Sequence, residues 1–226
     1  MNKLIYILTF VITTTAIAQN SNTITLEKQK LKQALAYGDK SVIAATMYSI
    51  VAIEGAQSTY KDSLAYLYFN NRNYVSCFFV TNDILSYKQN ELELIEMKAI
   101  SLESMGAYGK ASETYNELLI KTNNNYHAYK LAGLQLVLKK FEEAFVSIKK
   151  ADQLSDDGKV KVNFQVNKNF NQNVDLKAAI AYLEGIIALN LEKADEAKLS
   201  FERAVKLFPD FVLAKGKLEA LNAVKD

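Results

Sequence analysis

Small and large apolar residues recur along most of this chain in three columns that keep a common register. The first column closes four similar motifs, spaced by 34 residues (77 to 111), 33 residues (111 to 144) and 53 residues (144 to 197). A second column of small residues lies twelve positions upstream, and a third of large residues lies four positions downstream of the last three motifs. The columns are Cys77, Ala111, Ala144 and Ala197; Ala65, Ala99, Ala132 and Gly185; and Tyr115, Ile148 and Phe201. Their common register indicates an internal repeat.

Helix geometry explains why these positions are small or large. A small residue is required where two helices cross closely, and a large apolar residue one turn later fills the neighbouring hole. Each repeat is therefore predicted to be a pair of antiparallel helices, which stacks on the next pair because it cannot bury its apolar face alone. The scarcity of helix breakers, 8 Gly and 1 Pro in 226 residues, agrees with helices joined by short turns.

The segment 178–210 resembles a tetratricopeptide repeat. Its matching residues are Gly185, Ala197, Phe201, Ala204 and Pro209. The resemblance implies an all-α fold, a right-handed superhelix of stacked antiparallel helix pairs. Glu184 and Lys98 depart from the pattern, since they stand where the family usually has leucine. Helical repeats of another family are the alternative.

The repeat register divides the chain into units. Residues 19–226 are expected to form one repeat domain, and its units are expected at 24–57, 58–91, 92–124, 125–157 and 177–209. A final helix over 211–224, with leucines on its inner side and lysines outside, is expected to cap the stack.

The longest spacing, 53 residues, points to an insertion at 155–175. Inside it, Val160, Val162, Phe164 and Val166 alternate with polar residues, a period-2 pattern that the rest of the chain lacks. We expect a small β-hairpin that projects from the helices, with an irregular loop as the alternative. Insertions in repeats often emerge on a binding face, so Val162, Phe164 and Phe170 are candidate contact residues.

The first 18 residues resemble a bacterial secretory signal. Lys3 precedes an apolar stretch over 4–12, and the small residues Ala16 and Ala18 precede Gln19. Cleavage is predicted between Ala18 and Gln19, with export to the periplasm and no membrane span afterwards. A membrane anchor is the alternative, although the apolar stretch is short for one.

The chain lacks the residue combinations that catalysis or metal binding needs. His127 is the only histidine and is expected to be exposed, and Cys77 is expected to be a buried structural thiol. Glu91, Glu93 and Glu96 suit the first turns of a helix better than acid–base catalysis. We therefore predict no catalytic residues, no metal and no cofactor. The net charge of +2, with lysines interleaved among acids, also argues against a nucleic-acid partner.

These features favour a non-catalytic scaffold that binds a protein, through a peptide segment or a helix in a concave groove. The alternative is an accessory protein that binds a small ligand or glycan, and an enzyme is the third possibility considered. In tetratricopeptide folds the first helix of each unit lines the groove, which selects residues off the packing face. These are Asp62, Tyr66, Phe69, Asn70, Glu96, Met97, Ile100, Glu103, Tyr129, Lys130, Tyr182 and Ile186.

Overall fold

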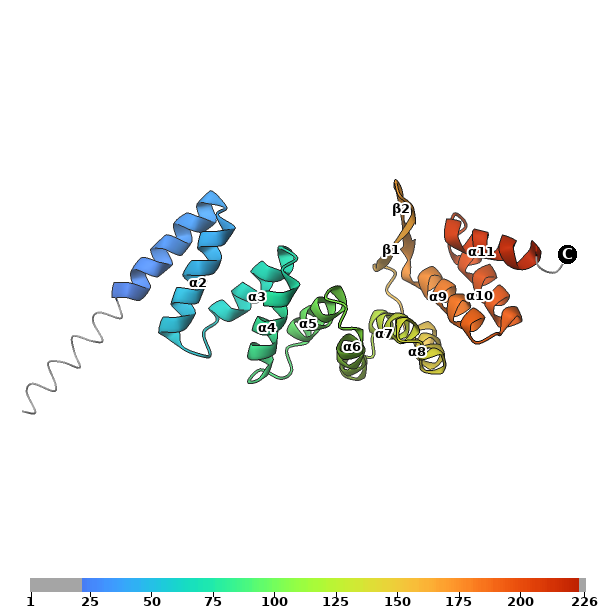
Figure 1. The fold of residues 1–226 in the computed structure, drawn as a ribbon, viewed down its shortest axis with the longest axis horizontal. Helices are drawn as coiled ribbons and strands as arrows, with labels where there is room; N and C mark the ends of the chain where they lie inside the picture. The colour runs from blue at the N-terminus through green and yellow to red at the C-terminus, as the bar shows by residue number, and fades with distance from the viewer. Residues whose placement is uncertain (1–21, 224–226) are drawn as a thin grey trace, which may run out of the picture. The chain divides into compact units, whose positions relative to one another are not determined.

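The computed structural model describes residues 22–223, in which helices joined by short turns flank a single hairpin (Figure 1). The helices are α1 (22–37), α2 (Lys40–Glu54), α3 (Tyr60–Asn70), α4 (Tyr74–Leu85), α5 (Leu92–Ser104), α6 (Tyr108–Thr122), α7 (Asn125–Val137), α8 (Phe141–Gln153), α9 (Leu176–Asn190), α10 (Ala194–Leu207) and α11 (Val212–Ala223). The prediction of an all-helical repeat fold with a small insertion is confirmed.

The chain divides into two compact parts, each larger than one repeat, which are called unit 1 and unit 2 from here on. Unit 1 ends at Ser101, and unit 2 begins at Leu102. In unit 1, α2 packs on α3 and α3 packs on α4. In unit 2, each helix from α6 to α11 packs on the next one along the chain. Helices that are neighbours in sequence are thus neighbours in space within each unit, as stacked helix pairs require.

The small-residue columns lie at close helix crossings. The seven members of these columns other than Gly185 are fully buried, and so are the large residues Tyr115, Ile148 and Phe201. A Cβ atom on Gly185 would lie only 2.5 Å from the ring of Phe201. Glycine is required there because the aromatic ring of α10 occupies the space that a side chain of α9 would need.

The turn inside each helix pair has a shared left-handed residue, which forms a fourth column. Gly38, Arg72, Gly106, Lys139 and Glu192 have φ angles of 70°, 57°, 76°, 58° and 59°. In each case the amide of the next residue donates to the carbonyl five positions earlier, at 2.9 to 3.0 Å. This is the hydrogen-bond pattern of a Schellman helix end. The column shows that the turn between α1 and α2 keeps the repeat geometry.

His127 is buried, so the expectation that it is exposed was wrong. Asn124 caps α7 by accepting hydrogen bonds from the Tyr126 and His127 amides at 2.8 and 3.4 Å. This cap places His127 in the first turn of α7, where its Nδ1 lies 2.8 Å from the Thr122 hydroxyl oxygen. The ring is only 7% exposed, because it faces back onto α6 instead of toward solvent.

The insertion is a hairpin, as the alternating pattern predicted. Strand β1 (Lys161–Asn167) pairs antiparallel with β2 (Phe170–Asp175), and the register breaks between Gln165 and Asn167. The alternative of an irregular loop is wrong. Val162 faces Val174 across the pair, and Val174 is fully buried, whereas Phe170 near the turn is 47% exposed.

One face of the hairpin docks on the helices of unit 2. The Phe164 ring lies 5.0 Å from that of Phe211 and 5.5 Å from that of Tyr182, measured between centroids. Gln172 donates to the Asp210 carbonyl at 2.6 Å and accepts from the Val212 amide at 3.1 Å, which caps the start of α11. The hairpin therefore contributes to the core of unit 2 as well as projecting from it, which the alternation alone did not show.

Glu184, one of the departures from the leucine pattern, joins three helices in unit 2. It is 4% exposed, and its carboxylate lies 2.6 Å from Lys149 Nζ of α8 and 2.5 Å from a guanidinium nitrogen of Arg203 of α10. Arg203 also pairs with Asp152 of α8 at 2.7 Å, and the Ser200 hydroxyl donates to Glu184 at 3.2 Å. These charge-assisted bonds offset the cost of burying the carboxylate.

None of the helices between residues 22 and 223 combines the length and apolar character needed to cross a bilayer. The predicted leader at residues 1–18 and its cleavage point lie outside the described residues. Cys77 is fully buried, and burial raises the pKa of its thiol, in agreement with a structural role.

Candidate functional site

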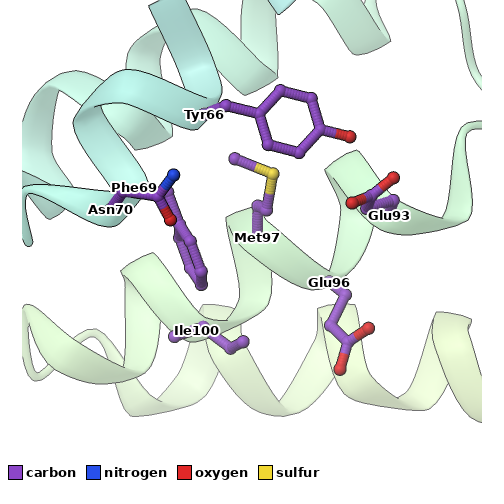
Figure 2. A pocket seen from close by; sticks show the side chains of 7 residues that line it. All are labelled: Tyr66, Phe69, Asn70, Glu93, Glu96, Met97 and Ile100. Atoms are coloured by element: carbon purple, nitrogen blue, oxygen red, sulfur yellow. The ribbon is translucent and has the colours of Figure 1, made fainter.

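A pocket of about 340 Å³ lies between α3 and α5 in unit 1. It brings together residues from the first helices of two successive helix pairs (Figure 2). Its lining residues are Tyr66, Phe69 and Asn70 from α3, and Glu93, Glu96, Met97 and Ile100 from α5. Six of these seven are residues that the sequence placed in a groove.

Helical spacing explains how seven side chains reach one pocket. The α3 residues stand at positions i, i+3 and i+4, and the α5 residues stand at i, i+3, i+4 and i+7, so each set lies along one helix face. On α3, Leu64 and Ala65 come directly before Tyr66, and on α5, Ile95 and Ala99 stand among the lining residues; each of these four residues is at most 2% exposed. Because these small and branched residues hold the packing side of each helix, the lining residues are directed toward the pocket.

One end of the pocket is apolar. Phe69 and Ile100 lie near each other at this end, and Met97 extends between Phe69 and the Tyr66 ring (Figure 2). Met97 is 4% exposed and belongs to the core cluster of unit 1, so it forms a fixed floor. Phe69 is held from the other side by an edge contact with Tyr74, at 6.3 Å between ring centroids.

The other end is acidic. The Tyr66 hydroxyl is directed toward Glu93 (Figure 2), and its hydrogen bond to that carboxylate raises the pKa of Tyr66 to about 12. Glu96 lies one turn further along α5. A second hollow adjoins this end and shares Tyr66 and Glu93; there Asp62 is paired with Lys88 at 2.8 Å. Glu93 is therefore a carboxylate at the pocket edge that faces a tyrosine hydroxyl.

Solved structures with the same arrangement of helices identify the fold. YrrB, described as a TPR protein with an unusual peptide-binding site, aligns over 91% of this chain and 97% of its own, with a TM-score of 0.66 and 14% identity. MamA from Desulfovibrio magneticus RS-1 aligns over 84% of this chain and 97% of its own, with a TM-score of 0.61 and 13% identity. The chain has the tetratricopeptide-repeat fold. No protein-family model and no curated protein matches the sequence.

The candidate groove residues lie on α3, α5, α7 and α9, each of which is the first helix of its helix pair. The predicted residues on α7 and α9, in unit 2, make different contacts from those on α3 and α5. Tyr129 stacks on Tyr126 at 6.5 Å between centroids, and burial raises its pKa. Tyr182 contacts Phe164 of the hairpin, and burial raises its pKa too.

The other two predicted residues on α7 and α9, Lys130 and Ile186, make contacts within unit 2. Lys130 Nζ lies 2.6 Å from a Glu103 carboxylate oxygen and 5.7 Å from the Tyr115 ring centroid. Ile186 packs against the cluster formed by Ala188, Ala197 and Phe201. Of the candidate groove residues, the structure gathers six from α3 and α5 around one pocket. Asp62 lines the adjoining hollow, and Glu103 pairs with Lys130.

Sequence reasoning missed Glu93 as a pocket residue, because its place near the start of α5 already explained a negative charge. The usable signal was its spacing, since Glu93 stands four positions before Met97 and three before Glu96. Within residues 22–223, no group of three histidine, cysteine or acidic side chains is arranged to hold a metal ion.

Proposed function

We propose that this chain is a non-catalytic protein-interaction scaffold of the periplasm, which binds a peptide segment or helix of a partner in the groove of its first helices. The observation that carries the proposal is the pocket between α3 and α5, where residues selected by the repeat register converge. A pocket with an apolar floor and a few fixed polar groups suits a side chain of a docked peptide.

Three further observations support this function. YrrB, whose fold this chain shares, is described as having a peptide-binding site. The single histidine is buried against Thr122, which leaves the pocket without an imidazole for general-base or nucleophile-assisting chemistry. The basic, apolar and small-residue order of residues 1–18 supports export.

Selection of random displayed peptides on the purified chain tests the proposal. Ile100→Arg fills the apolar end of the pocket, and Val75→Arg makes the same change at a 53% exposed position of α4 outside the pocket. Selected peptides are expected to bind the wild type and Val75→Arg alike. They should bind Ile100→Arg with about 2 kcal/mol less free energy, as is typical of a central contact residue.

Equal binding to both variants would mean that the groove of unit 1 is not the binding site. Export is tested separately by N-terminal sequencing of the protein from its native host. A mature chain that begins at Gln19 is expected, and an intact Met1 would contradict periplasmic release.

A further inference from the structure

We propose that the pocket between α3 and α5 binds an arginine or lysine side chain of an extended partner peptide. The proposal rests on the proposed function and makes it specific, because it names the residue that the partner inserts. The apolar floor would receive the methylene stem, and the acidic end at Glu93 would receive the charged head.

Charge is the first argument. The Glu93 carboxylate lies at the acidic end of the pocket, and among the described residues that line the pocket there is no lysine or arginine. In the adjoining hollow, Lys88 already pairs with Asp62. The acidic end therefore favours a cation from outside the chain, and disfavours a peptide carboxylate or a phosphate group.

Shape is the second argument. Long basic side chains bury their methylene stems on apolar surfaces and keep the charged group at a polar edge. The pocket has this order: Phe69, Ile100 and Met97 at one end, and the Tyr66 hydroxyl with Glu93 at the other (Figure 2). The Tyr66 ring is 38% exposed, so one aromatic surface remains available to a cation.

Unit 1 itself provides two examples of a cation held by a ring and a carboxylate together. Lys28 Nζ lies 3.0 Å from Glu54 and 5.7 Å from the Tyr60 ring centroid. Lys61 pairs with Asp83, and its Nζ lies 5.5 Å from the Tyr87 ring centroid. Tyr66 and Glu93 offer the same combination at the pocket, without a lysine of the chain among its lining residues as described.

A purely apolar anchor fits less well. It would cover the Glu93 carboxylate and remove it from water while offering no opposite charge, which costs free energy. An arginine replaces the lost water with charge-assisted hydrogen bonds and can stack on the tyrosine ring. Arginine should therefore bind somewhat more tightly than lysine.

The test uses the tightest-binding peptide from the selection of displayed peptides, together with variants of that peptide that differ only at the inserted residue. Replacing its arginine or lysine by glutamine or norleucine is expected to weaken binding roughly tenfold, and replacement by glutamate more. The variant Glu93→Gln should reduce this preference to about twofold. Glu113→Gln, at an exposed position outside the pocket, makes the same change in net charge and should leave the preference intact.

Each other outcome has a defined meaning. Peptides that Ile100→Arg excludes, but that bind equally with arginine, glutamine or norleucine, overturn this inference and leave the proposed function standing. The absence of any peptide sensitive to Ile100→Arg overturns both. If arginine amide alone binds as tightly as the peptide, the occupant is a small amine and the peptide assignment is wrong. Circular dichroism of every variant checks that the helices are retained.

Discussion

Aromatic residues on the first helices of the two units lie in opposite surroundings. On α3 of unit 1, Tyr66 is 38% exposed and borders a pocket. On α9 of unit 2, Tyr182 contacts the rings of Phe164, Phe201 and Phe211, at 5.5, 5.7 and 5.0 Å between centroids. Tyr66 stands one residue after the small-residue column at Ala65, and Tyr182 stands three residues before the column at Gly185. The two positions are one helical turn apart on the same face of a first helix, yet only Tyr66 borders a pocket.

The hairpin explains part of the difference. Phe164 of β1 covers Tyr182, and Gln172 of β2 holds the start of α11, so that Phe211 closes the cluster from the other side. Unit 1 has no such insertion between residues 22 and 101. An insertion can therefore cover a side chain that the repeat register predicted to face a groove, so the register predicts a binding surface only where no added segment covers it.

The largest expected effect concerns these two tyrosines. Tyr182→Ala is expected to lower the free energy of unfolding by about 3 kcal/mol, because it leaves a cavity among three aromatic rings. Tyr66→Ala should lower it by less than about 1 kcal/mol, because the ring is partly in water. Urea denaturation measures both free energies of unfolding. Equal losses in the two variants would contradict the different packing of Tyr66 and Tyr182.

The second prediction concerns the tight crossing of α9 and α10. Gly185→Ala is expected to cost about 2 kcal/mol of stability, since its Cβ would lie 2.5 Å from the buried Phe201 ring. Gly133→Ala is the matched control in α7, where the added Cβ would lie 3.9 Å from a methyl carbon of Leu183, an ordinary van der Waals contact. There alanine should stabilise by up to about 1 kcal/mol through its better helix propensity. Thermal and urea unfolding of the two variants should therefore shift in opposite directions.

A smaller effect is expected from the two positions that depart from leucine. Glu184→Gln should destabilise by about 1–2 kcal/mol, because Arg203 and Lys149 lose a buried partner charge. Lys98, its counterpart in unit 1, is half-buried, and its Nζ lies 2.9 Å from the Asn82 amide oxygen. Lys98→Gln should change stability by less than about 0.5 kcal/mol. Similar losses of stability in the two variants would mean that the ion pairs of Glu184 contribute little to the stability of the fold.

The sequence predicted the helix pairs because small residues at close crossings leave a direct signal, as Gly185 and Phe201 demonstrate. It did not reveal the fourth column of left-handed turn residues, because Arg72, Lys139 and Glu192 occupy positions where glycine would have marked the conformation. Their geometry comes from the helix-end hydrogen bonds, which sequence does not display.

Residues that depend on contacts distant in sequence were the hardest to predict. His127 looked exposed because it begins a helix, but the Asn124 cap turns it toward Thr122. Alternation predicted the hairpin, whereas its docking depends on Phe164 meeting Phe211, 47 positions away (164 to 211). Six of the seven pocket residues were predicted from the repeat register. Glu93 was missed because its position near the start of α5 already explained its negative charge.

The smallest expected effect is a change in the pKa of Tyr66, because the pKa values of Tyr66 and Tyr182 are raised by different causes. A hydrogen bond to Glu93 is the main reason that the pKa of Tyr66 rises to about 12, whereas burial raises that of Tyr182. Because the pKa of Tyr66 lies above its unfolded value of about 10, its stabilising contribution is complete below pH 10 and is lost as the pH rises through 12. Glu93→Gln should lower the pKa of Tyr66 and leave that of Tyr182 unchanged. Carbon NMR of labelled tyrosines, assigned with Tyr66→Phe and Tyr182→Phe, follows the onset of each ionisation. A Tyr66 onset that does not move would mean that Glu93 does not hold the hydroxyl, and the acidic end of the pocket would lose its fixed geometry.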